Sequence, residues 1–112
     1  MTLYMVSFGV STNGNLSAED GECDARKRRN AAYEAAFSLG PAWHGGQTAV
    51  FLRTEATPTS IVHAVEKALS GGLVVVAEVS HDSPFHFSGI RFDEDGFESL
   101  IPNAVDLSEE PP

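Results

Sequence analysis

The chain has 112 residues, of which 42% are hydrophobic, a single cysteine (Cys23) and a formal net charge of −9. This length fits one domain with one core, and the lone cysteine excludes an intramolecular disulfide. The negative net charge disfavours a nucleic-acid partner, without excluding one, because a negative field repels phosphates. No stretch approaches the ~20 apolar residues of a membrane span and the N-terminus has no signal-peptide pattern, so we expect a cytoplasmic protein with no membrane contact.

The first two predicted elements are a strand and a helix. Leu3–Val10 is apolar apart from Ser7, which is the pattern of a strand buried on both faces. The polar run that follows, through Gly21, is typical of a long loop. The residues Asp24–Leu39 predict a helix, because they are rich in alanine and carry apolar side chains at i, i+4 spacing. Gly40, followed by a proline, ends this helix.

A hairpin and a second helix come next. Gln47–Thr54 alternates in a way that predicts a strand, and Gly45–Gly46 predicts a tight turn to a short strand around Trp43. In the following helix Thr57 is the expected N-cap, and Gly71 is expected to close the end. Three features therefore delimit this helix: a capping threonine, a proline at its first position and a terminal glycine.

The last third of the chain begins with an apolar strand. Gly72–Val79 (GLVVVAEV) is continuously apolar but for one glutamate, which predicts a central strand. Beyond it, aromatic residues indicate a further extended segment, and Asp95–Gly96 predicts a turn. The resulting order, β-α-β-β-α-β, predicts an α+β fold of the ferredoxin-like type, with an extra C-terminal extended segment. We expect one domain over residues 1–100 and an acidic, proline-rich flexible tail over 101–112.

With this order, the chain resembles the small CRISPR-associated endoribonucleases and the related VapD-type ribonucleases. The resemblance covers Leu3–Val79 and rests on four segments: YMVSFGV, TAVFLRT, TPTSIVHAV and GLVVVAEV. In nuclease members of these families, the resemblance implies, an aspartate ends the first strand and holds a divalent metal together with its twin across a dimer axis. The matching position here is Gly9.

A glycine at this position offers no carboxylate to a metal. Mg²⁺ is bound by oxygen ligands, usually including one or two carboxylates. We therefore expect no catalytic residue, no metal site and no cofactor at the end of this strand. Gly9 is expected instead to let another backbone come close.

Two groups of residues are candidates for binding. The basic cluster on the first helix either contacts phosphates or an acidic partner, or forms ion pairs on a solvated helix, since Glu22 and Asp24 precede two of its arginines by four residues. Trp43 and His44 lie at the predicted hairpin edge, which is a plausible place for a ligand. His81, Asp82 and His86 have no recognised metal-ligand spacing. The candidate binding residues are Arg26, Lys27, Arg28, Arg29, Trp43 and His44.

The phenylalanines that follow the predicted core indicate self-association. Leaving a large aromatic side chain in water is unfavourable by ~1.5–3 kcal/mol, so these residues either cover the open sheet face of their own chain or pair with a second chain. The resemblance implies exchange of a C-terminal strand between protomers, so we expect a homodimer. The residues expected at this interface are Phe85, Phe87, Ile90 and Phe92.

Three functional hypotheses follow. The first is a non-catalytic, homodimeric binding or regulatory protein. The second is a metal-dependent endoribonuclease that recruits carboxylates such as Glu78 or Asp82, for which Mg²⁺ would be the cofactor. The third is an inhibitor or immunity-type module, whose acidic surface occupies the site of a basic protein partner.

Overall fold

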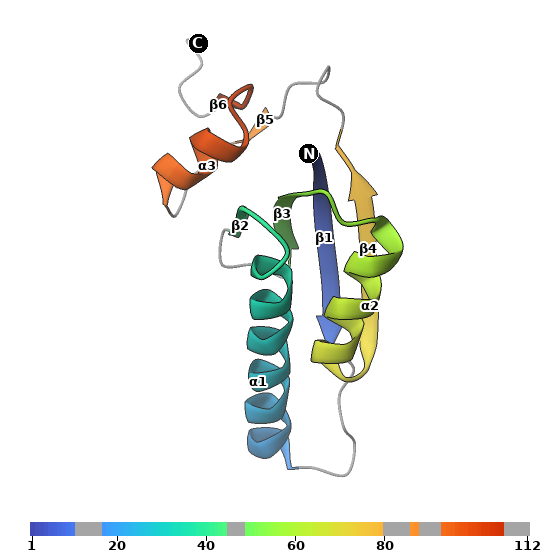
Figure 1. Ribbon diagram of the computed structural model, residues 1–112. Helices are drawn as coiled ribbons and strands as arrows, with labels where there is room; N and C mark the ends of the chain where they lie inside the picture. The colour runs from blue at the N-terminus through green and yellow to red at the C-terminus, as the bar shows by residue number, and fades with distance from the viewer. Residues whose placement is uncertain (11–16, 45–48, 80–85, 88–92, 107–112) are drawn as a thin grey trace.

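The computed structural model describes residues 1–10, 17–44, 49–79, 86–87 and 93–106. The elements in chain order are β1 (Thr2–Val10), α1 (Ala18–Phe37), β2 (Ala42–His44), β3 (Ala49–Thr54), α2 (Pro58–Leu69), β4 (Gly72–Glu78), β5 (His86–Phe87), α3 (Glu94–Leu100) and β6 (Val105–Asp106). The fold class is α+β, as predicted from the sequence. Figure 1 shows α1 and α2 lying side by side on one face of a sheet.

The main sheet has four antiparallel strands in the order β2-β3-β1-β4. In its register Val6 of β1 lies opposite Val50 of β3 on one side and Val76 of β4 on the other. The predicted strands at Leu3–Val10 and Gly72–Val79 are therefore neighbours in one sheet. The short strands β5 and β6 form a separate parallel pair.

The main core lies between the helices and the sheet. Fully buried side chains of α2 (Ile61, Val65 and Leu69) pack against alternate residues of the strands, such as Val6 and Leu52. From α1 the buried residues are Ala32 and Ala36, whose small side chains let the long helix lie close to the sheet. The helix face of the sheet thus supplies every second residue of β1 and β3, as strand geometry requires.

A smaller core lies on the opposite face of the sheet and involves α3. Phe97, Leu100 and Ile101 are buried there against Leu3 of β1. The guanidinium Nη2 of Arg53 donates to the Leu100 carbonyl at 2.8 Å, which fixes the end of α3 to β3. Ala104, beyond the end of α3, is half-buried and also packs against this core.

Capping residues set the helix boundaries. Ser17 accepts a hydrogen bond from the Asp20 N–H (3.1 Å) and starts α1 six residues before the predicted start, so the predicted loop through Gly21 is wrong from Ala18 onward. Thr57 caps α2 as predicted, by accepting from Ser60 N–H at 3.2 Å. At the other end the left-handed C-cap residue is Ser70, not Gly71.

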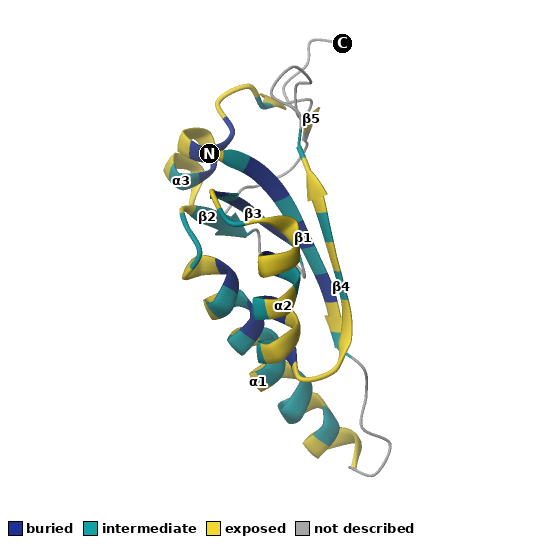
Figure 2. Ribbon diagram, turned by 45° about the vertical axis from the view of Figure 1, so that its right-hand side comes forward, coloured by how far each residue is buried: buried dark blue, intermediate teal, exposed yellow. Residues whose placement is uncertain are grey.

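Two predictions about strand burial are wrong. β1 alternates between buried and less buried residues, because α3 covers only one end of its second face. β4 was predicted to be central, but in the sheet formed by the described strands it lies at the edge, and its residues are exposed or half-buried (Figure 2). Leu73 and Val75 of this strand are 68% and 47% exposed.

The predicted turn at Asp95–Gly96 is also wrong, because both residues lie inside α3. Asp93 caps this helix by accepting from the Gly96 N–H at 3.2 Å. The apolar side chains of Phe97 and Leu100, three residues apart, then reach the second core together. No helix in the described ranges is long and apolar enough to cross a membrane.

Candidate functional site

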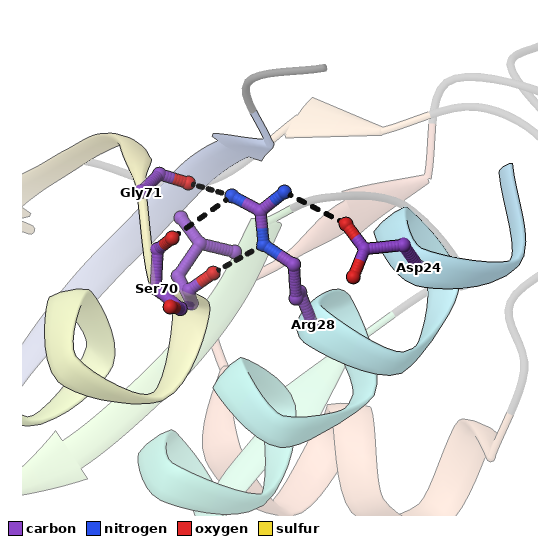
Figure 3. A network of polar contacts seen from close by, with 5 residues as sticks. Asp24, Arg28, Ser70 and Gly71 are labelled. Atoms are coloured by element: carbon purple, nitrogen blue, oxygen red, sulfur yellow. Dashed lines mark hydrogen bonds and ion pairs between the residues drawn. The ribbon is translucent and has the colours of Figure 1, made fainter. Parts of the chain in front are cut away.

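The basic cluster of α1 does not act as one unit, because Arg28 is engaged inside the fold (Figure 3). Its Nε donates to the Leu69 carbonyl at 2.8 Å, and its Nη2 donates to the carbonyls of Ser70 (3.2 Å) and Gly71 (2.5 Å). Its Nη1 pairs with Asp24 Oδ2 at 3.2 Å. Arg28 therefore satisfies carbonyl groups at the C-terminal end of α2, where a cation is favoured by the helix dipole.

The other basic residues of the cluster have different surroundings. Arg26 and Lys27 are exposed, and Arg29 is half-buried. Of the two ion pairs suggested by the spacing, Asp24–Arg28 is confirmed, whereas no ion pair joins Glu22 and Arg26, both of which lie in the described part of α1. Arg26 and Lys27 thus remain free to meet an external partner, and Arg28 does not.

An aromatic stack joins α1 to β2. His44 stacks on Tyr33 with ring centroids 4.4 Å apart, and on Phe37 at 5.4 Å. Burial raises the pKa of the Tyr33 phenol, and the positive charge of Arg29 opposes this effect. His44 is therefore part of the packing between the helix and the edge strand. Its half-buried ring leaves only part of the imidazole accessible from outside.

Trp43 points to the opposite face of the sheet. Its ring lies 4.7 Å from that of Phe97 in an edge-to-face arrangement and stacks on Phe51 at 6.2 Å. Trp43 and His44, adjacent in sequence, thus lie on opposite faces of β2 and do not form a shared site. Trp43 belongs to the second core.

The part of the sheet left uncovered by α3 is the candidate binding surface. Alternate residues of β1 and β4 face away from the helices here, and we call this surface the open patch. In the register Met5 lies opposite Ala77, Ser7 opposite Val75 and Gly9 opposite Leu73. The three β4 residues are exposed, Met5 and Ser7 are half-buried, and none of the side chains in the patch carries a charge. The open patch consists of Met5, Ser7, Gly9, Leu73, Val75 and Ala77.

The two glycines at one end of this patch have opposite steric roles. Among the described residues, a side chain at Gly9 would meet nothing within 4 Å, so for this part of the chain the expectation that Gly9 admits a close backbone is wrong. The glycine that does so is Gly72, where a Cβ would collide with the Gly9 carbonyl oxygen. Gly72 also has φ +136°, a value that disfavours other residues.

No group of three or more potential metal ligands occurs among the residues that the structure describes. Glu78, one carboxylate of the nuclease hypothesis, is exposed at the end of β4, and His86 is exposed on β5. Asp82 and His81 lie outside the described residues.

Of the residues expected at a dimer interface, Phe85, Ile90 and Phe92 lie outside the described residues. Phe87 belongs to β5, where its backbone pairs with that of Asp106. For Phe97, the alternative of packing within its own chain is confirmed, because it is buried in the second core.

The sequence prediction missed Leu73 and Val75. Three consecutive valines in β4 are typical of a strand with two buried faces. They place the same residue type on both faces, so the sequence does not show that one face is exposed. The usable signal was the order of elements, since the last strand of a β-α-β-β-α-β chain lies at the edge of its sheet when both crossover connections skip one strand.

Comparison of the chain with protein-family models, with curated proteins and with solved structures finds no match.

Proposed function

We propose that this chain is a non-catalytic, homodimeric protein that binds or regulates a partner, on a ferredoxin-like scaffold similar to that of the small CRISPR-associated and VapD-type ribonucleases. The strand order β2-β3-β1-β4, with both crossover helices on one face, supports the ferredoxin-like part of the proposal. Gly9, at the position where those nucleases carry an aspartate, supports a role in binding.

The observation that carries the proposal is the exposed apolar surface of β4. Leu73 and Val75 are the most exposed large hydrophobic residues of the described sheet. Fully burying such a side chain stabilises an assembly by ~1.5–3 kcal/mol. The open patch carries no charge and exposes neighbouring apolar side chains, which is typical of a protein interface.

Size-exclusion chromatography with light scattering tests the assembly. We expect a mass of two chains, with a dissociation constant that decreases as salt is added, because each chain carries a net charge of −9 and screening weakens the repulsion between copies. A monomer at every protein and salt concentration would contradict the homodimer.

A nuclease assay tests the non-catalytic part. The protein is incubated with single-stranded and duplex RNA in Mg²⁺ or Mn²⁺, with and without chelator. We expect no cleavage above that of a mock preparation. Cleavage that the chelator abolishes would instead support the metal-dependent endoribonuclease hypothesis.

A further inference from the structure

The two edges of the main sheet differ in how they are protected. The β2 edge is a strand of three residues, Ala42–His44, and α3 packs beside it. The β4 edge runs over seven residues, Gly72–Glu78, with no proline, no lysine and Glu78 as its one charged residue. Short strands, covering elements, charges and prolines are the usual means of keeping a sheet edge from pairing. Within the described residues β4 has its strand partner, β1, on one side only.

The hydrogen bonds of β4 show which backbone groups face outward. Val79 N–H donates to the Leu3 carbonyl of β1 at 2.8 Å. Because the backbone groups of successive residues alternate in direction along a strand, Leu73, Val75 and Ala77 also direct theirs toward β1. The N–H and C=O groups of the intervening residues point away from β1, toward the free edge; these are Gly72, Val74, Val76 and Glu78.

We propose that the β4 edge pairs with the β4 edge of a second copy, antiparallel and across a two-fold axis at Val75, so that two four-stranded sheets become one of eight strands. This inference rests on the proposed homodimeric function and names its interface. A second copy is the fitting occupant, because it presents the same edge, which has one charged residue and no strand partner among the described residues, and one two-fold contact removes both edges at once.

The position of Glu78 and the length of β4 favour one register for this pairing. With Val75 on the axis, all seven residues of β4 are paired, Leu73 lies opposite Ala77 of the other copy, and Glu78 lies opposite Gly72. The two copies of Glu78 are then held ~20 Å apart along the strands. A register with Glu78 on the axis would place like charges directly opposite each other, which is unfavourable. Since Val75 directs its backbone groups toward β1, it forms a non-hydrogen-bonded pair with its copy, with Cα atoms ~4.5 Å apart.

Disulfide cross-linking tests both the edge and the register. The cross-linking variant is Val75→Cys in a Cys23→Ser background. The two copies of residue 75 have Cα atoms ~4.5 Å apart in the proposed pairing, which is within the range of about 4.4–6.8 Å that a disulfide accepts. The matched control is Leu73→Cys on the same face of the same strand, where the two thiols are offset by four residues, or ~13 Å. Circular dichroism of each variant checks that it is folded.

We expect Val75→Cys to form a covalent dimer under mild oxidation at least about tenfold faster than Leu73→Cys. Equal rates, or faster cross-linking of the control, would overturn the proposed pairing. If light scattering shows a dimer but Val75→Cys does not cross-link, the β4 interface is wrong and the homodimeric function stands. If the chain is a monomer throughout, both are wrong.

Discussion

Replacing Arg28 with alanine removes the guanidinium that joins α1 to the end of α2. The wild-type side chain donates to the carbonyls of Leu69, Ser70 and Gly71 and pairs with Asp24. The bond to Leu69 is partly buried, and a hydrogen bond to a charged group contributes ~1.5–3 kcal/mol. The other two bonds are exposed, so water replaces most of what they contribute. We expect Arg28→Ala to lower the free energy of unfolding by about 2–3 kcal/mol.

Urea unfolding followed by circular dichroism measures this loss, and two variants of the same helix calibrate it. Asp24→Asn removes only the ion pair, which is partly buried, and should cost about 1 kcal/mol or less. Arg26→Ala removes the same charge from an exposed position and should change stability by no more than about 0.5 kcal/mol. If Arg28→Ala costs no more than Arg26→Ala, the three carbonyl bonds do not hold the helices together and the reasoning is refuted.

Three further variants probe other parts of the fold. Gly72→Ala should cost about 2–4 kcal/mol in urea unfolding, because its Cβ would collide with a backbone oxygen, whereas Gly9→Ala should be neutral within about 0.5 kcal/mol; equal costs would contradict the assigned steric roles. Phe97→Ala should cost about 3–5 kcal/mol and shift the fluorescence of Trp43, whose ring it contacts; an unchanged spectrum would count against the second core. Burial raises the pKa of Tyr33 above its ordinary 10.0, so above that pH the unfolded chain loses a proton that the folded chain keeps, and stability falls as the pH rises. Tyr33→Phe should remove this part of the decline, and an identical pH profile would refute its origin in Tyr33.

Local signals made α2 predictable, and α1 only in part. Thr57 and the proline after it act within one turn, so the sequence alone locates the start of the helix. The start of α1 had an equivalent signal in Ser17 followed by Asp20, but the glycine at position 21 and its polar neighbours favoured a loop. The hydrogen bond from Asp20 N–H to Ser17 and the acidic first turn outweigh that glycine.

Tertiary contacts decided the elements that the sequence could not locate. In α3, the Asp95–Gly96 pair has the composition of a turn, but burial of Phe97 against Leu3 and Trp43 favours the helix. For β4, no local feature distinguishes an edge from a centre, because that depends on which strand the chain returns to. The sequence identified Gly9 as a residue of interest at the end of the first strand. Its place on the open patch, near Leu73 and Val75, depends on the pairing of β1 with β4, which the sequence does not specify.

The space around Gly9 allows an aspartate to be introduced there, at the position where the nucleases that this chain resembles carry their metal-binding aspartate. The variant tests whether positions 9 of two copies lie close enough to share one metal ion. Because a side chain at this position meets no described residue within 4 Å, Gly9→Asp should fold like the wild type and present a carboxylate on the open patch. In the proposed dimer, however, positions 9 of the two copies are separated by three strand spacings, roughly 14 Å, and by about 13 Å along the strands. One cation cannot bridge them, since carboxylate oxygens ligate Mg²⁺ at about 2.1 Å.

Isothermal titration of Gly9→Asp with Mg²⁺ and Mn²⁺ should therefore show no binding beyond that of the wild-type protein. The matched control, Gly9→Asn, keeps the size of the new side chain without its charge. If the aspartate variant alone bound one ion per two chains, the two copies of β1 would have to meet at the dimer axis. That result would contradict pairing through β4, because only a contact that places the open patches face to face brings both carboxylates to the same ion.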